Sequence, residues 1–219
     1  MGIKERLLKL KSLLPKGVTL VAVSKTKPVT DLMQAYDAGQ RIFGENKVQE
    51  MVEKHQQMPK DVQWHMIGHL QRNKVKYMAE FVDLIHGVDS LKLLTEINKQ
   101  AKKHDRVINC LLQIKIASED TKFGFNREDA LALINSDEFQ DLKHIHISGV
   151  MGMASFTNET KQVKTEFENL KNIFDTLKKN QPGMEIISMG MSGDYQLAIS
   201  CGSTMIRVGS HIFGARHYT

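Results

Sequence analysis

Cysteine is scarce in this chain, which has two among 219 residues. Cys110 and Cys201 form no C-x-x-C pair and no Cys/His spacing typical of zinc ligands. We therefore expect two buried thiols and no metal site.

Long apolar runs are also missing, because no stretch approaches the roughly 18 residues of a membrane span. Residues 1–14 place apolar side chains at helical spacing between lysines, unlike the continuous apolar centre of a signal peptide. We expect a cytoplasmic protein with no membrane partner.

The chain has no concentrated block of positive charge, although 30 basic residues exceed 25 acidic ones and give a formal net charge of +5. Its lysines are scattered over several predicted helices, and no arginine-rich arm or aromatic-interleaved basic block occurs. This pattern indicates a solvated surface rather than nucleic-acid binding. Without a linker or repeat, residues 1–219 are expected to form a single domain.

Short apolar runs alternate with amphipathic helical patterns along the whole chain. Eight of these runs are predicted strands: 20–23, 41–43, 62–67, 82–86, 107–116, 144–150, 185–188 and 204–208. Strands separated by helices pair in parallel through right-handed crossovers. The count favours a single (β/α)8 barrel of the TIM type, with an extra N-terminal helix.

The first predicted strand ends in a lysine that continues its core face. Side chains alternate along a strand, so Val21, Val23 and Lys25 share one face. An amine held in a partly apolar pocket can lose its proton and attack an aldehyde. The alternative is a solvated lysine in a strand-to-helix loop.

Further candidate site residues lie in the carboxyl-terminal parts of the other predicted strands or just after them, where the active site of such a barrel lies. They are Asn46, His65, Lys122, Met151, Ser192, Arg207, Gly209 and Ser210. Residues 189–192 (Met-Gly-Met-Ser) and 209–210 (Gly-Ser) follow strands seven and eight, where barrels often bind phosphate. The alternative is that these two segments are ordinary Gly/Ser turns that bind no phosphate.

Arg207 alternates with Ile206 and Val208, which are expected to face the helices. Its guanidinium is therefore predicted to point into the barrel, where it needs a ligand or a carboxylate. Because strand eight neighbours strand one in a closed barrel, Arg207 should lie near Lys25.

Six ordered motifs resemble the pyridoxal phosphate homeostasis protein family, whose fold is similar to the N-terminal barrel of alanine racemase. The motifs are Ala22-Val23-Ser24-Lys25-Thr26-Lys27, Phe43-Gly44-Glu45-Asn46, Trp64-His65-Met66-Ile67-Gly68-His69-Leu70-Gln71, Ser188-Met189-Gly190-Met191-Ser192, Gly202-Ser203-Thr204 and Ile212-Phe213-Gly214-Ala215-Arg216. They span nearly the whole chain.

The resemblance implies that Lys25 carries pyridoxal 5′-phosphate (PLP) as an internal aldimine and that Arg207 faces the pyridine nitrogen. The implied phosphate ligands are Ser192, Gly209 and Ser210. The residues implied around the ring are Asn46, His65 and Met151. His65 has the alternative role of a core histidine. Lys122 is interpreted as a solvated loop residue rather than a second pocket lysine, and Lys27 as a surface residue.

A carrier and regulator of intracellular PLP is favoured over an enzyme. An arginine at the ring nitrogen disfavours its protonation and weakens the ring as an electron sink. The chain stops at Thr219, so we expect no second domain to supply the other catalytic group of a racemase. The expected partners are PLP and PLP-dependent apo-enzymes, and the expected state is a monomer or weak dimer. A PLP-dependent racemase or lyase and a cofactor-free Schiff-base aldolase remain alternatives.

Overall fold

The chain folds into a closed barrel of parallel strands. A computed structural model describes residues 1–117 and 123–214, and within them eight strands pair in sequence order, with the last strand pairing with the first. The strands are β1 (Thr19–Val23), β2 (Ile42–Glu45), β3 (Gln63–Met66), β4 (Val82–Val88), β5 (Ile108–Gln113), β6 (Ile145–Met151), β7 (Ile186–Ser188) and β8 (Met205–Val208). The predicted (β/α)8 barrel is confirmed.

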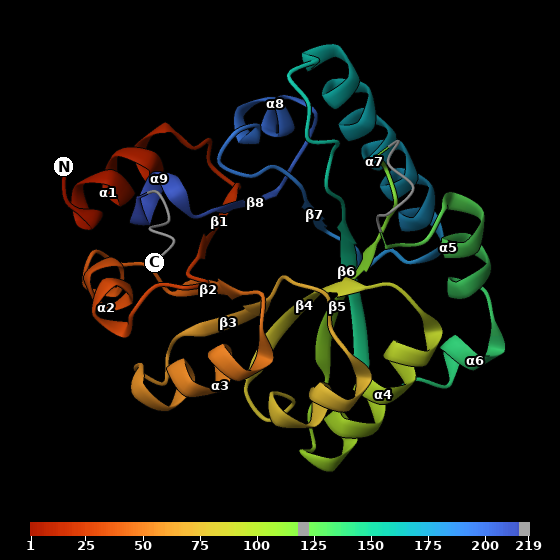
Figure 1. The fold of residues 1–219 in the computed structure, drawn as a ribbon. Helices are drawn as coiled ribbons and strands as arrows, with labels where there is room; N and C mark the ends of the chain where they lie inside the picture. Colours follow the sequence, from red (N-terminus) through yellow and green to blue (C-terminus); the bar gives the residue numbers. More distant parts are fainter. Residues whose placement is uncertain (118–122, 215–219) are drawn as a thin grey trace.

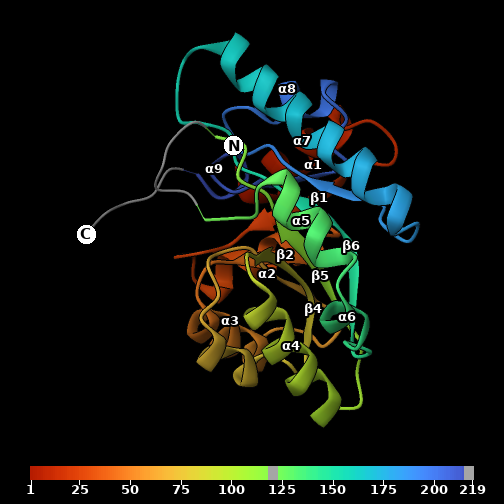
Figure 2. The same cartoon turned by 90° about the vertical axis from the view of Figure 1, so that its right-hand side faces the viewer.

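Helices surround this ring of strands (Figure 1). They are α1 (Ile3–Leu13), α2 (Val29–Asp37), α3 (Val48–Gln57), the 3-10 helix η1 (Arg72–Tyr77), α4 (Leu91–Lys103), α5 (Arg127–Ile134), α6 (Asp137–Gln140), α7 (Thr160–Asn180), α8 (Tyr195–Ser200) and α9 (Ser210–Phe213). Figure 2 turns the barrel so that α5 lies in front of the strands. No helix of the described residues combines the length and apolar character needed to cross a bilayer.

The N-terminal helix α1 lies outside the barrel beside α9, as expected for an addition to the (β/α)8 pattern (Figure 1). Its buried residues Ile3, Leu7 and Leu10 recur at helical spacing and form its apolar face. Arg6 Nε donates to the Ile212 carbonyl at 2.7 Å, which connects α1 to α9. Opposite ends of the described chain therefore meet at the β1–β8 seam.

Alternation along the strands divides the apolar residues into two clusters. On β8, Ile206 and Val208 belong to the large cluster between the strands and the helices. A smaller cluster, which we assign to the barrel interior, contains Val21, Leu84, Leu111, Met151 and Met205. Arg207 shares the inner face of β8 with Met205, as the sequence predicts.

Several predicted boundaries were wrong. The fifth strand was predicted over 107–116, but β5 ends at Gln113 because the chain then pairs with the following loop through a bridge between Ile114 and Phe125. The sequence also predicts a short helix near residues 73–78, and the structure has the 3-10 helix η1 there. The short helices α6 and α9 were not predicted. Lys122 and the Ala215–Arg216 part of the last motif lie outside the described residues.

Candidate functional site

A pocket of about 200 Å³ opens where the strands end at their carboxyl termini. Its lining residues come from loops far apart in sequence: Val23, Lys25, Lys27, Asn46, Ile67, Met153, Met191, Ser192, Arg207, Gly209, Ser210 and Gly214. Six of the eight predicted site residues therefore share one pocket. The location matches the rule for active sites in this fold.

Lys25 lies in a tight turn directly after β1. The Lys27 amide donates to the Ser24 carbonyl at 3.0 Å, which closes the turn around Lys25 and Thr26. Thr26 has a φ of +65°, a left-handed conformation that is uncommon for a β-branched residue and costs about 1–3 kcal/mol. The surrounding contacts must therefore hold this turn in place.

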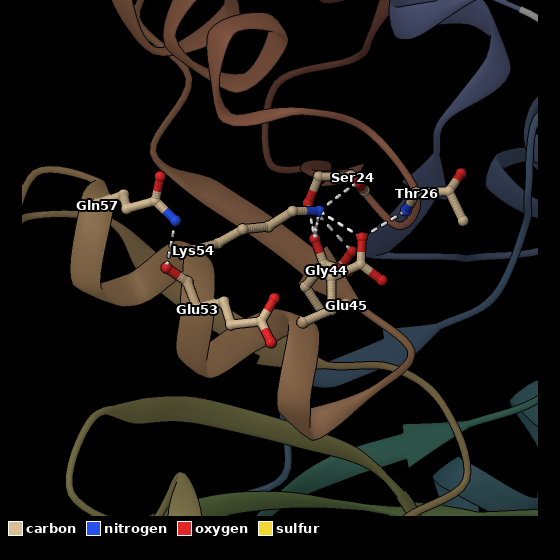
Figure 3. Close-up of polar contacts among 8 residues, drawn as sticks. Ser24, Thr26, Gly44, Glu45, Glu53, Lys54 and Gln57 are labelled. Carbon is tan, nitrogen blue, oxygen red and sulfur yellow. Dashed lines mark hydrogen bonds and ion pairs between the residues drawn. The ribbon is translucent and has the colours of Figure 1, made fainter.

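A buried ion cluster lies behind the turn, between β1, β2 and α3 (Figure 3). Lys54 Nζ donates to Glu45 Oε1 and Glu50 Oε1, each at 2.7 Å, and to the Ser24 carbonyl at 2.8 Å. Its three donors are thus all used. Burial raises the pKa of the Glu45 carboxyl, and the Lys54 ammonium opposes that shift. The cluster ties α3 to the end of β1.

Serine and glycine residues of the loops after β7 and β8 also line the pocket. The Gly209 amide donates to Ser192 Oγ at 3.4 Å, so the loops after β7 and β8 touch. A Cβ at Gly209 would lie 2.9 Å from the Val23 carbonyl, and one at Gly190, where φ is +95°, would lie 2.6 Å from the Ala198 Cβ. Only glycine permits this close approach.

Arg207 supplies a buried positive charge on the pocket wall. Its guanidinium donates to the Ser188 carbonyl at 2.8 Å, to Ser188 Oγ at 2.6 Å and to the Gly152 carbonyl at 3.2 Å. Burial lowers the pKa of Arg207 to about 10, with Asp194 opposing that shift, so the group stays protonated at neutral pH. Among residues 1–117 and 123–214 no carboxylate forms a salt bridge with it.

A chain of buried hydrogen bonds runs from Arg207 across the barrel interior. His86 Nδ1 lies 3.0 Å from Ser188 Oγ, and His86 Nε2 lies 3.0 Å from His65 Nδ1. Burial lowers the pKa of His65 to about 3 and that of His86 well below its usual value, so both rings are neutral. Because arginine only donates, the Ser188 hydroxyl accepts from Arg207. The directions of the Ser188–His86 and His86–His65 hydrogen bonds follow from the tautomers of the two neutral rings. The chain holds Arg207 as a fixed donor.

Two predicted ring residues lie below the pocket instead of lining it. His65 is 5% exposed and bonded to His86, as expected for its alternative role as a core histidine. Met151 belongs to the interior apolar cluster. Lys27 was interpreted as a surface residue, but it lines the pocket and its Nζ lies 3.3 Å from the Phe213 carbonyl.

The sequence reasoning missed His86, Ser188 and the Glu45–Lys54 pair. The alternation rule offered a signal for the first two, because both occupy inward positions on predicted strands. Lys54 gave no such signal, since a lysine in an amphipathic helix is usually solvated.

The chain is similar to known proteins over nearly its whole length. The family model described as "Alanine racemase, N-terminal domain" matches residues 2–217. The pyridoxal phosphate homeostasis protein of Pasteurella multocida is 42% identical over 93% of this chain and 88% of the relative. The corresponding protein of Escherichia coli is 38% identical over 94% of this chain and 88% of the relative.

Solved structures have the same fold. PipY of Synechococcus elongatus with PLP bound is 35% identical, with a TM-score of 0.88 over 97% of this chain and all of that one. The alanine racemase of Clostridium difficile, 18% identical, has a TM-score of 0.79 over 99% of this chain and 56% of that one, a likeness of fold alone. On its match to the family model and its identity to these relatives, the chain belongs to the pyridoxal phosphate homeostasis protein family, within the alanine racemase N-terminal domain fold.

Proposed function

We propose that the chain binds PLP in the pocket at the carboxyl ends of the strands and serves vitamin B6 homeostasis as a carrier and regulator. The observation that carries this proposal is the combination of groups in one pocket. Lys25 offers an amine, Arg207 a buried cation without a carboxylate partner among the described residues, and the loops at Ser192 and Gly209 a hydroxyl and glycine edge. PipY, 35% identical, has PLP bound.

These groups fit the parts of the cofactor. The Lys25 amine would form a Schiff base with its aldehyde: nitrogen bonds to the aldehyde carbon, and the carbonyl oxygen leaves as water with the two amine protons. The backbone amides and hydroxyls of residues 192, 209 and 210 suit a phosphate. Arg207 suits the ring nitrogen as a hydrogen-bond donor, with Asn46 beside the ring. His65 and Met151 would support these residues from below.

The hydrogen bonds that hold Arg207 in place favour a carrier role over catalysis. When bound, PLP serves as an electron sink, and that capacity is greatest with a protonated ring nitrogen. Arg207 stays charged and its hydrogen bonds to Ser188 hold it in place, so it donates to the nitrogen and disfavours that protonation. The relatives are named as homeostasis proteins. Transfer to an apo-enzyme requires only exchange of one amine for another at the same carbon.

A PLP-dependent racemase or lyase is the alternative. Either requires groups that move protons at the substrate carbon. His65 and His86 are neutral, buried and bonded to each other, which does not suit that task. A cytoplasmic location, a monomeric or weakly dimeric state and delivery to PLP-dependent apo-enzymes stay predictions.

The first prediction concerns the covalent site. Wild-type protein mixed with PLP should turn yellow, and borohydride reduction followed by peptide mass mapping should place the pyridoxyl group on Lys25. Lys25→Ala should lose this label, whereas Lys164→Met, which changes an exposed lysine of α7, should keep it. A label mainly on another lysine would refute the assignment. Colourless protein with aldolase turnover would favour the cofactor-free alternative, and amino-acid turnover of about 1 s⁻¹ or more that depends on Lys25 would refute the carrier role.

A further inference from the structure

The ion cluster of Lys54, Glu45 and Glu50 contacts the backbone on both sides of Lys25. Lys54 Nζ binds the Ser24 carbonyl at 2.8 Å, which belongs to the peptide group before Lys25. Glu50 Oε1 accepts from the Thr26 amide at 2.6 Å, which belongs to the peptide group after Lys25. Figure 3 shows Ser24 next to the end of the Lys54 side chain, with Thr26 further along the turn.

Two fixed peptide planes determine the direction of the side chain between them. Peptide groups are rigid, so the backbone at Lys25 has only its φ and ψ angles to adjust. Holding the carbonyl on one side and the amide on the other sets both angles, and with them the Cα–Cβ bond of Lys25. The left-handed Thr26 shows that the turn is held against its local preference.

Burial and shared hydrogen bonds keep the side chains of the ion cluster in fixed positions. Lys54 is 5% exposed, and Glu45, whose Oε1 also accepts from Ser24 Oγ at 2.6 Å, is fully buried. One carboxylate oxygen, Glu50 Oε1, accepts from both Lys54 and the Thr26 amide, so the two backbone contacts depend on each other. Buried charges of this kind hold their geometry because any separation leaves one of them unpaired.

We propose that Lys54 and Glu50 are positioning residues that aim the Lys25 amine into the pocket and select it over the neighbouring Lys27 for reaction with the cofactor aldehyde. This inference rests on the proposed function. Lys27 lines the same pocket two residues further on, so proximity alone does not distinguish the two amines. Orientation does, since small misplacements of a reacting group reduce its rate strongly.

The experiment compares Lys54→Met, Glu50→Ala and Glu50→Gln with the control Lys164→Met. The control breaks a Lys–Glu pair of similar sequence spacing with Glu168, on the exposed face of α7. Each protein is mixed with PLP and reduced with borohydride, and the pyridoxyl label is mapped. We expect the ratio of label on Lys27 to label on Lys25 to rise about tenfold in Lys54→Met and Glu50→Ala. Glu50→Gln keeps an acceptor for the Thr26 amide and should stay close to wild type, as should the control.

A second measurement uses no cofactor. Hydrogen exchange of the Thr26 amide, followed by NMR, should be about tenfold faster in Glu50→Ala than in wild type or Glu50→Gln. Glu50 is partly exposed and its replacement spares the Glu45–Lys54 pair, so this variant remains informative where Lys54→Met does not fold.

The outcomes separate the two ideas. No label on wild type contradicts the proposed function, whereas the exchange data still test the clamp. Wild-type label on Lys25 with unchanged ratios in the variants overturns the positioning role. Unchanged exchange at Thr26 in Glu50→Ala overturns the clamp itself.

Discussion

At the scale of single residues, Arg207 stands out because its positive charge is buried in the pocket wall. It is 4% exposed, and its hydrogen bonds go to carbonyls and one hydroxyl rather than to a carboxylate. Its charge is therefore left to act on whatever occupies the pocket. A cation held in this way favours an electron-rich acceptor such as a ring nitrogen.

Replacement of Arg207 by alanine should weaken PLP retention. The ring nitrogen would lose its donor, at a cost of about 1–3 kcal/mol for an unsatisfied buried group. Spectroscopic titration of the variant should show this as a higher dissociation constant, with Lys25 still labelled after reduction. Ser188→Ala should show a smaller effect, because it removes one of the bonds that orient Arg207. An unchanged affinity in Arg207→Ala would show that the guanidinium does not meet the cofactor.

Individual site residues could be predicted only where they lie in a predicted strand or next to its end, because the alternation of side chains then gives their direction. Arg207 stands between the apolar residues Ile206 and Val208 on a predicted strand, so its inward direction could be read from the sequence. Lys25 continues the alternation of Val21 and Val23 just past the end of β1, which gave the same signal. The role of Lys54 could not be predicted in this way, because it depends on contacts with Ser24 and Glu45, which lie on two other elements. Tertiary pairing of this kind leaves no periodic pattern in the sequence.

At the scale of elements, the order of strands and helices follows from local patterns, and their ends depend on neighbours. The closed barrel could be predicted because eight apolar runs alternate with amphipathic helical patterns, an order that does not change when a boundary shifts by a few residues. The end of β5 could not, since a bridge from Ile114 to Phe125 replaces strand pairing there. The short helices α6 and α9 contain too few residues to show a period.

The pairing of β6 with β7 depends on one glycine. A Cβ at Gly149, where φ is +159°, would lie 1.8 Å from the Ile186 carbonyl oxygen, and neither backbone can move without breaking the sheet. Gly149→Ala should lower the free energy of unfolding by about 3 kcal/mol or more. Urea unfolding measures this directly. Gly193→Ala, with nothing within 4 Å of the added Cβ, is the control and should stay within about 0.5 kcal/mol of wild type. Equal stabilities of the two variants would contradict the packing argument.

At the scale of the whole molecule, the neutral histidines inside the barrel should make stability depend on pH. The folded-state pKa values of His65 and His86 lie below the unfolded value of 6.5. Below pH 6.5 the unfolded chain therefore takes up protons that the folded protein does not, and the free energy of unfolding falls. Each histidine contributes about 1.4 kcal/mol per pH unit, until the pH reaches its folded-state pKa. Above pH 6.5 the two contribute no slope.

Urea unfolding at pH 7.5 and pH 5.5 tests this dependence. The protein should be clearly less stable at the lower pH, and His86→Gln, which removes one of the two buried histidines, should reduce the loss by about 1.4 kcal/mol. The same loss of stability in His86→Gln as in wild type would contradict the prediction, because it would mean that His86 takes up a proton equally in the folded and unfolded states.

The β1–β8 seam has a consequence for how the protein is made. Thr19 pairs with Met205 and Val21 with Arg207, so strands from opposite ends of the described chain become neighbours only when the barrel closes. During synthesis, at about 5–20 residues per second, β1 must wait for the seven later strands before it finds this partner. Until then β1 and the most recently made strand are unpaired edges, which are open to aggregation and to chaperones. Lys25 leaves the ribosome early and Arg207 late, so a nascent chain has the reactive amine well before it has the complete pocket.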